Sequence, residues 1–156
     1  MAVGLRSVQS DDRSFLYELY CSTRADELGA LGWSELQREV FLKQQFAAQQ
    51  RAFDGLSHAD HQIILKDGRP IGRMIVVRND EELRLADIAL LAEHRNHGIG
   101  TSLIRELLNE AQSVGKPMRL QVLNTNRAIL LYQRMGLEIR SERGMYLQMQ
   151  WDSRRG

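Results

Sequence analysis

The residues best suited to chemistry lie in one short segment between an apolar run and a helical pattern. The segment comprises Arg95, Asn96, His97, Gly98, Ile99, Gly100, Thr101 and Ser102. The first backbone amides of a helix have no carbonyl partner, and glycine leaves them accessible to a ligand. With the positive end of the helix dipole and the Arg95 charge, these amides predict a site for an anion such as a phosphate or pyrophosphate.

Spacing alone leaves two interpretations of this segment open, a tight turn from strand to helix or a phosphate-binding loop. Two nucleotide-binding motifs are absent from the sequence. The P-loop pattern G-x-x-x-x-G-K-[ST] does not occur, and the dinucleotide motif G-x-G-x-x-G lacks its third glycine because Leu103 stands there. The sequence therefore disfavours ATP hydrolysis and nicotinamide chemistry.

The elements that precede this segment begin with a strand and two helices. A strand is expected over residues 4–9, and a loop with two glycines over residues 26–33. The candidate caps of the first helix are Ser10, Asp11 and Asp12. Ser34 and Gln37 fit a capping box at the start of the second helix. A core-facing stripe is expected on that helix at Leu36, Val40, Phe41 and Ala47.

The later elements are mostly strands. Asp67–Gly68 predicts a hairpin turn within residues 62–80, and residues 81–92 continue as a third strand. A helix ending at Gly115, a strand over 117–124, a helix over 126–136 and two strands within 137–151 follow. The last two strands are expected to turn around Glu142 to Gly144 and to place Met145, Leu147, Met149 and Trp151 on one face.

This order predicts an α/β (α+β) fold built on one central sheet. The strand, helix and strand across residues 83–123 imply a parallel crossover, whereas the flanking hairpins imply antiparallel pairs. We therefore expect a mixed, mostly antiparallel sheet of about seven strands, with helices on both faces.

Length and composition favour a single globular domain over residues 1–156. The chain is 43% hydrophobic and 26% charged, and its formal net charge is only +1. That charge favours neither a nucleic acid nor an anionic membrane as a partner. Cys21 is the only cysteine, and the N-terminus does not resemble a secretory signal, so we expect a cytoplasmic protein.

Two motifs in order resemble those of the GCN5-related N-acetyltransferase (GNAT) superfamily. The first is R-x-x-G-x-G after an apolar strand, followed by the helical "TSLIRELLNEAQSVG". The second is "NRAILLYQRMGL" downstream, and the resemblance covers about residues 61–151. It implies a GNAT-like sheet with a splayed parallel strand pair, an acyl-CoA-binding core at about 61–136 and acceptor-side elements at about 10–60.

The resemblance also implies how the acyl donor is held. The diphosphate of acetyl-CoA would rest on the loop Arg95 to Gly100 and on Thr101 and Ser102, and Asn126 would lie near the pantetheine. Backbone groups of Leu90, Leu91 and Ala92 would bind the pantetheine arm. The Leu90 amide would donate to the thioester oxygen as the charge on that oxygen develops.

Two side chains are candidates for acid–base chemistry. Tyr132 matches the tyrosine that protonates the departing thiolate in the family, although an amphipathic core tyrosine is an alternative interpretation. Asp87 interrupts an apolar run and is the candidate general base; a carboxylate bound to local backbone or to an arginine is at least as good an interpretation. Gln121 stands where some members have a glutamate and cannot take up a proton.

The function expected from the resemblance is acetyl-CoA-dependent N-acetylation of a primary amine, on a small molecule or peptide, by direct transfer in a ternary complex. A catalytically silent acyl-CoA-binding regulatory module is the alternative. No metal is expected, because His94 and His97 have no ligand at metal-site spacing. Strand edges near the C-terminus make a homodimer plausible.

Overall fold

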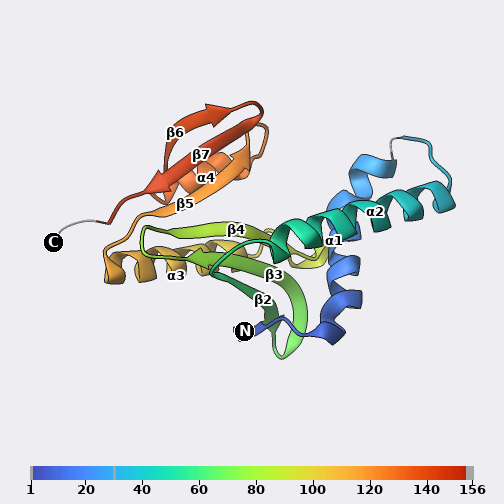
Figure 1. Ribbon diagram of the computed structural model, residues 1–156, viewed down its shortest axis with the longest axis horizontal. Coiled ribbons are helices and arrows are strands. Elements are labelled where there is room, and N and C mark those ends of the chain that lie inside the picture. Colours follow the sequence, from blue (N-terminus) through green and yellow to red (C-terminus); the bar gives the residue numbers. More distant parts are fainter. Residues whose placement is uncertain (1, 30, 154–156) are drawn as a thin grey trace. The chain divides into compact units, whose positions relative to one another are not determined.

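The computed structural model describes residues 2–29 and 31–153 (Figure 1). The strands are β1 (Val3–Ser7), β2 (Ala59–Lys66), β3 (Arg69–Arg78), β4 (Leu83–Leu90), β5 (Met118–Leu123), β6 (Glu138–Arg143) and β7 (Tyr146–Trp151). The helices are α1 (Arg13–Gly29), α2 (Glu35–Asp54), α3 (Ile99–Val114) and α4 (Ala128–Arg134), with short 3₁₀ turns η1 (Ser10–Asp12) and η2 (Ala92–His94).

The strands form one seven-stranded sheet in the order β1-β2-β3-β4-β5-β7-β6. β4 and β5 are parallel, whereas β1 with β2, β5 with β7 and β6 with β7 are antiparallel. The parallel ladder joins Leu83–Leu85 to Met118–Leu120 and stops there, although both strands continue. The predicted mixed sheet with a parallel pair is confirmed.

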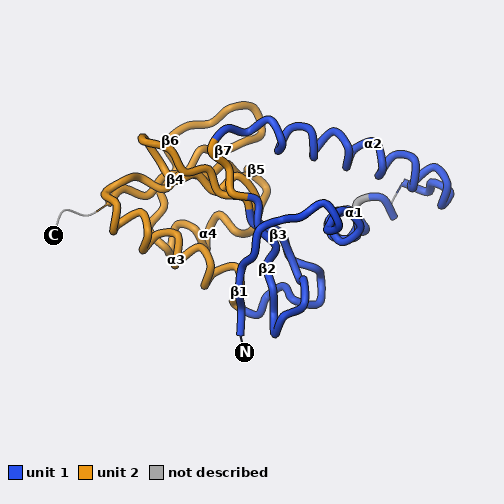
Figure 2. Tube along the Cα trace, turned by 60° about the horizontal axis from the view of Figure 1, so that its bottom comes forward, with its two compact units in different colours: residues 1–57, 61–74, 88–97 blue, residues 58–60, 75–87, 98–156 orange. Residues whose placement is uncertain are grey.

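The chain divides into two compact units, which Figure 2 shows in different colours. The first comprises Met1–Ser57, His61–Met74 and Ile88–His97, and the second comprises His58–Asp60, Ile75–Asp87 and Gly98–Gly156. In the sheet the boundaries fall inside three strands, β2, β3 and β4. The single domain expected over residues 1–156 stays a prediction.

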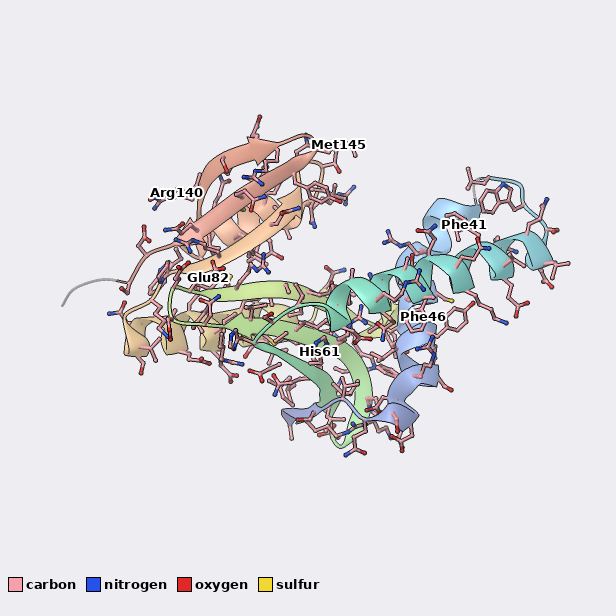
Figure 3. All side chains as sticks on the ribbon, in the orientation of Figure 1. Phe41, Phe46, His61, Glu82, Arg140 and Met145 are labelled. Atoms are coloured by element: carbon pink, nitrogen blue, oxygen red, sulfur yellow. The ribbon has the colours of Figure 1, made fainter. Side chains whose placement is uncertain are left out.

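In the first unit, α1 and α2 pack through aromatic side chains. Phe46 of α2, labelled in Figure 3, is buried. Its ring contacts those of Tyr17 and Tyr20 with centroid distances of 5.4 and 5.8 Å. The predicted stripe is therefore partly wrong, because Leu36 and Val40 are 70% and 48% exposed. The face of α2 that meets α1 is set by Phe46 and the half-buried Leu42.

A capping box precedes each helix of this unit, at the turn η1 ahead of α1, whose N-cap is Gln9, and at the start of α2. Ser34 and Gln37 form the predicted capping box of α2. Ahead of α1, Asp12 accepts from the Gln9 amide and forms a bidentate pair with Arg6, so it acts one turn later than a simple N-cap. The loop expected over residues 26–33 is corrected, since α1 continues to Gly29 and buries Leu28; Ala30 lies outside the described residues.

In the second unit, α3 covers β5 with an apolar stripe. The buried side chains on α3 are Ile99, Leu103, Ile104, Leu107, Leu108 and Ala111. Leu147 and Met149 of β7 are buried as predicted, but Met145 is 67% exposed (Figure 3). Met145 lies in the turn between β6 and β7, not in the strand, which corrects its predicted place in the core. All six residues of β6, the last strand in the sheet order, are exposed.

Candidate acyl-transfer site

The end of β4 carries the backbone groups expected to act on a thioester. The Leu91 amide donates to the Ile71 carbonyl of β3 at 2.8 Å. Because successive amides of a strand point to opposite edges, the Leu90 amide points away from β3. In the second unit, the ladder between β4 and β5 has already ended at Leu85 and Leu120.

Gly72 allows β3 and β4 to approach closely beside Leu90. A Cβ at position 72 would lie 2.2 Å from the Ala89 carbonyl oxygen and 2.8 Å from Leu90 Cδ2. No side chain fits at that distance, so glycine here is a packing requirement. The sequence reasoning had not singled out this residue.

Two side chains hold the segment that follows β4. Arg95 Nε donates to the Leu90 carbonyl at 2.9 Å, which fixes this arginine against the end of β4. The Ala92 amide donates to Ser22 Oγ of α1 at 3.4 Å. Ser22 had no sequence signal, because it lies 70 residues away from its partner.

The glycine segment contains two residues with left-handed backbone and the first amides of α3. Asn96 and Gly98 adopt left-handed conformations with φ of 62° and 79°. The first intrahelical bond of α3 is from the Ser102 amide to the Gly98 carbonyl, so the amides of Ile99, Gly100 and Thr101 precede it. A Cβ at Gly98 or Gly100 would have no protein atom within 4 Å. Arg95, Asn96 and His97 belong to the first unit, and Gly98 to Ser102 to the second.

Tyr132 and Asn126 lie in the second unit. Tyr132 of α4 is 8% exposed, and burial raises the pKa of its phenol, so the hydroxyl is protonated at neutral pH. Within the described residues, its hydroxyl has no hydrogen-bond partner. The Asn126 Oδ1 accepts from the Ala128 amide at 2.8 Å, in a local turn just before α4.

The predicted base and the two histidines have less distinctive surroundings. Asp87 is half-buried in β4 and interacts with other groups, so both interpretations of it stay open. The Gln121 Oε1 accepts from Gln148 Nε2. His94 Nδ1 is buried without a hydrogen-bond partner. In the part of the chain that the structure describes, no three His, Cys, Asp or Glu side chains are grouped as a metal site would need.

Arg73 is a buried cation that the sequence reasoning missed. It is 4% exposed in β3, and its guanidinium donates to Gln50 Oε1 at 2.9 Å and to Gln49 Oε1 at 3.0 Å. It also lies 4.8 Å from the centre of the Phe53 ring. These contacts account for two glutamines of the glutamine-rich α2. The one sequence feature that could have indicated a buried cation is the charge of Arg73 within the apolar run "IGRMIVV".

Comparisons with known proteins identify the family of this chain. The profile of the Acetyltransferase (GNAT) family matches residues 15–137. A Bacillus subtilis (strain 168) protein named uncharacterized N-acetyltransferase YjcF is 27% identical over 109 residues, covering 69% of this chain and 77% of that protein. The chain therefore belongs to the GNAT family and is an N-acetyltransferase.

Solved structures share the fold. The PaiA N-acetyltransferase of Thermoplasma acidophilum, in complex with coenzyme A, is 19% identical with a TM-score of 0.71, covering 97% of this chain and 99% of that one. The ribosomal-protein-S18-alanine N-acetyltransferase of Escherichia coli is also 19% identical, with a TM-score of 0.69, covering 99% and 97%. Among the described residues of this chain, no helix is long and apolar enough to cross a membrane.

Proposed function

We propose that this protein transfers the acetyl group of acetyl-CoA directly to a primary amine in a ternary complex. The observation that carries the proposal is the glycine segment, where left-handed Asn96 and Gly98 lead into a helix whose first amides precede the first intrahelical hydrogen bond. Such a helix start suits the diphosphate of coenzyme A. Arg95 supplies positive charge beside it, and Thr101 and Ser102 add hydroxyl donors.

Each chemical step has a group assigned to it. The neutral amine attacks the thioester carbonyl carbon, and the Leu90 amide donates to the oxygen that becomes negative. The carbon–sulfur bond then breaks, and Tyr132 protonates the thiolate. Since burial keeps the Tyr132 phenol protonated at neutral pH, it is in the form needed for this step. The amine proton passes to Asp87, directly or through water.

The rival is a silent acyl-CoA-binding module that keeps the loop without acid–base groups. The presence of Tyr132 at the position of the family's thiolate-protonating tyrosine favours the enzyme. Calorimetry with coenzyme A and release of free thiol from acetyl-CoA with a panel of amines separate the two. Binding without turnover of any amine would support the module, and absence of binding would reject both.

Variants test the assigned roles. Tyr132→Phe is expected to lower kcat by about 10²–10⁴-fold while the Kd for coenzyme A stays unchanged. Tyr146→Phe, on an exposed tyrosine of the same unit, is the matched control. Gly98→Val should weaken coenzyme A binding, because a β-branched residue is strained at φ 79° and its side chain would project where the diphosphate is placed. Equal affinity of Gly98→Val and wild type would refute that placement.

A further inference from the structure

A cavity between α1 and α2 lies outside the residues assigned to acetyl transfer. Its volume is about 290 Å³, near the lower end of the range for small-molecule sites. Leu28 and Leu42 supply an apolar surface, and Tyr17 adds an aromatic wall. Three charged side chains of α2, Glu35, Arg38 and Glu39, line the same cavity.

The charges around this cavity are not all neutralised by the protein. Glu39 pairs with Lys43 at 2.9 Å. Among the described residues, neither Glu35 nor Arg38 has an ion-pair partner, although they are three positions apart on one helix. Their side chains start from neighbouring points about 5–6 Å apart. Among the described residues that line it, the cavity therefore presents one carboxylate and one guanidinium without an ion-pair partner, beside an apolar surface.

We propose that this cavity binds a small α-amino acid with an apolar side chain, as a zwitterion. Its ammonium group would pair with Glu35, its carboxylate would pair with Arg38, and its side chain would lie against Leu28 and Leu42. A ligand with only one charge leaves one of the two protein charges unmatched. A guanidinium is suited to a carboxylate because it can donate two parallel hydrogen bonds.

The position of the cavity makes its ligand a candidate acceptor. Cys21 of α1 lines the cavity. The next residue, Ser22, accepts a hydrogen bond from the amide of Ala92, just after β4, the strand whose Leu90 amide is assigned to the thioester oxygen. The two side chains leave the same turn of α1 about 100° apart, so the cavity and the end of β4 contact adjoining sides of this helix. The role as acceptor rests on the proposed function, whereas the binding itself does not.

Three related ligands test the charge requirement by calorimetry without acyl-CoA. L-leucine carries both charges, L-leucinamide only the cation, and N-acetyl-L-leucine only the anion. We expect leucine to bind about three- to tenfold more tightly than either analogue. Absence of leucine binding in the millimolar range, or equal affinity for all three ligands, would overturn the proposal.

Two variants assign the charges. Glu35→Gln should abolish the preference for leucine over N-acetyl-leucine, which lacks the ammonium group. The preference for leucine over leucinamide, which lacks the carboxylate, should remain. Arg38→Gln should abolish the preference for leucine over leucinamide and leave the preference for leucine over N-acetyl-leucine unchanged. Glu18→Gln, on an exposed carboxylate of α1 that does not line the cavity, is the control and should change neither preference. Loss of both preferences in both variants would contradict the assignment.

Release of thiol from acetyl-CoA then tests the role of the ligand. Acetylation of leucine, with a KM raised in Glu35→Gln and Arg38→Gln but not in Glu18→Gln, supports leucine-type amino acids as acceptors. Turnover of other amines but not of leucine overturns the acceptor role. Binding of coenzyme A without turnover of any amine rejects the proposed function, while calorimetry still decides the cavity.

Discussion

Replacing Gly72 by alanine is expected to displace the end of β4 that carries Leu90. The new Cβ would lie 2.2 Å from the Ala89 carbonyl oxygen, whereas ordinary contacts begin at 3.4 Å. Since the obstructing atom belongs to the backbone, no side-chain rotation relieves it, and the two strands must separate by about 1 Å. A displacement of that size at a reacting group lowers rates by about 10²-fold, or about 2.7 kcal/mol of barrier.

Two measurements check this expectation. Overpacking of this kind costs about 1–3 kcal/mol of stability, which lowers the melting temperature by about 2–4 °C for each kcal/mol. The kcat/KM for acetyl transfer should fall about 100-fold in the folded variant. Binding of coenzyme A should change less than kcat/KM, because the glycine segment holds the diphosphate in the proposed complex.

Gly4→Ala is the matched control for Gly72→Ala. Gly4 lies in β1 of the same unit, and a Cβ there would have no atom within 4 Å. Its stability should stay within about 1 kcal/mol of wild type. An unchanged melting temperature in Gly72→Ala would refute the close approach of the strands, and a lowered melting temperature with wild-type kcat/KM would refute its link to the Leu90 amide.

Three further outcomes follow from buried and exposed residues. The Arg6 guanidinium lowers the pKa of Asp12 to about 2, below its unfolded value, so the stabilisation is complete above about pH 4 and is lost as the pH falls toward 2. Asp12→Asn should lower the free energy of unfolding by about 1–2 kcal/mol at pH 7. Between pH 2 and 5, its urea midpoint should change less with pH than that of wild type. Arg73→Met should lower the free energy of unfolding by about 3 kcal/mol or more, because Gln49 and Gln50 lose their charged partner; a wild-type urea midpoint would contradict this. Leu36→Lys should stay within about 0.5 kcal/mol of wild type in the same assay, whereas Phe46→Ala should lose about 3–5 kcal/mol, and the opposite ranking would restore the predicted stripe.

Local signals predicted much of this fold. The Ser34 capping box, the strand-to-helix segment before α3 and the alternation in β7 each depend on residues within a few positions of one another. Such local patterns can be recognised without knowing which elements pack against one another. The order of elements then implied the mixed sheet with one parallel pair.

The wrong predictions concern burial, that is, whether another element packs against a given side chain. Leu36 and Val40 have helical spacing, but α2 turns Phe46 toward α1 and leaves those two exposed. Met145 continues an apolar alternation, yet the tight turn at Gly144 removes it from the strand. Periodicity identifies a face of an element without stating whether another element meets it.

The site residues divide in the same way. The turn into α3 was predicted because its glycines lie in consecutive residues, and its role in binding an anion stays a prediction. Three other residues could not be predicted, because their roles come from contacts with residues that the sequence does not place beside them. Gly72 meets Ala89, Ser22 meets Ala92, and Arg73 meets Gln49 and Gln50.

The outer strand β6 has a consequence for how the protein behaves at high concentration. An unpaired strand edge is a template for another chain, and long, flat, apolar edges nucleate aggregates. β6 carries Glu138, Arg140, Glu142 and Arg143 in six exposed residues, and its register with β7 shifts between Ile139 and Ser141. Charge and irregular register both oppose the addition of a further strand. This edge therefore disfavours open-ended growth by strand addition, while the homodimer expected from the strand edges stays a prediction.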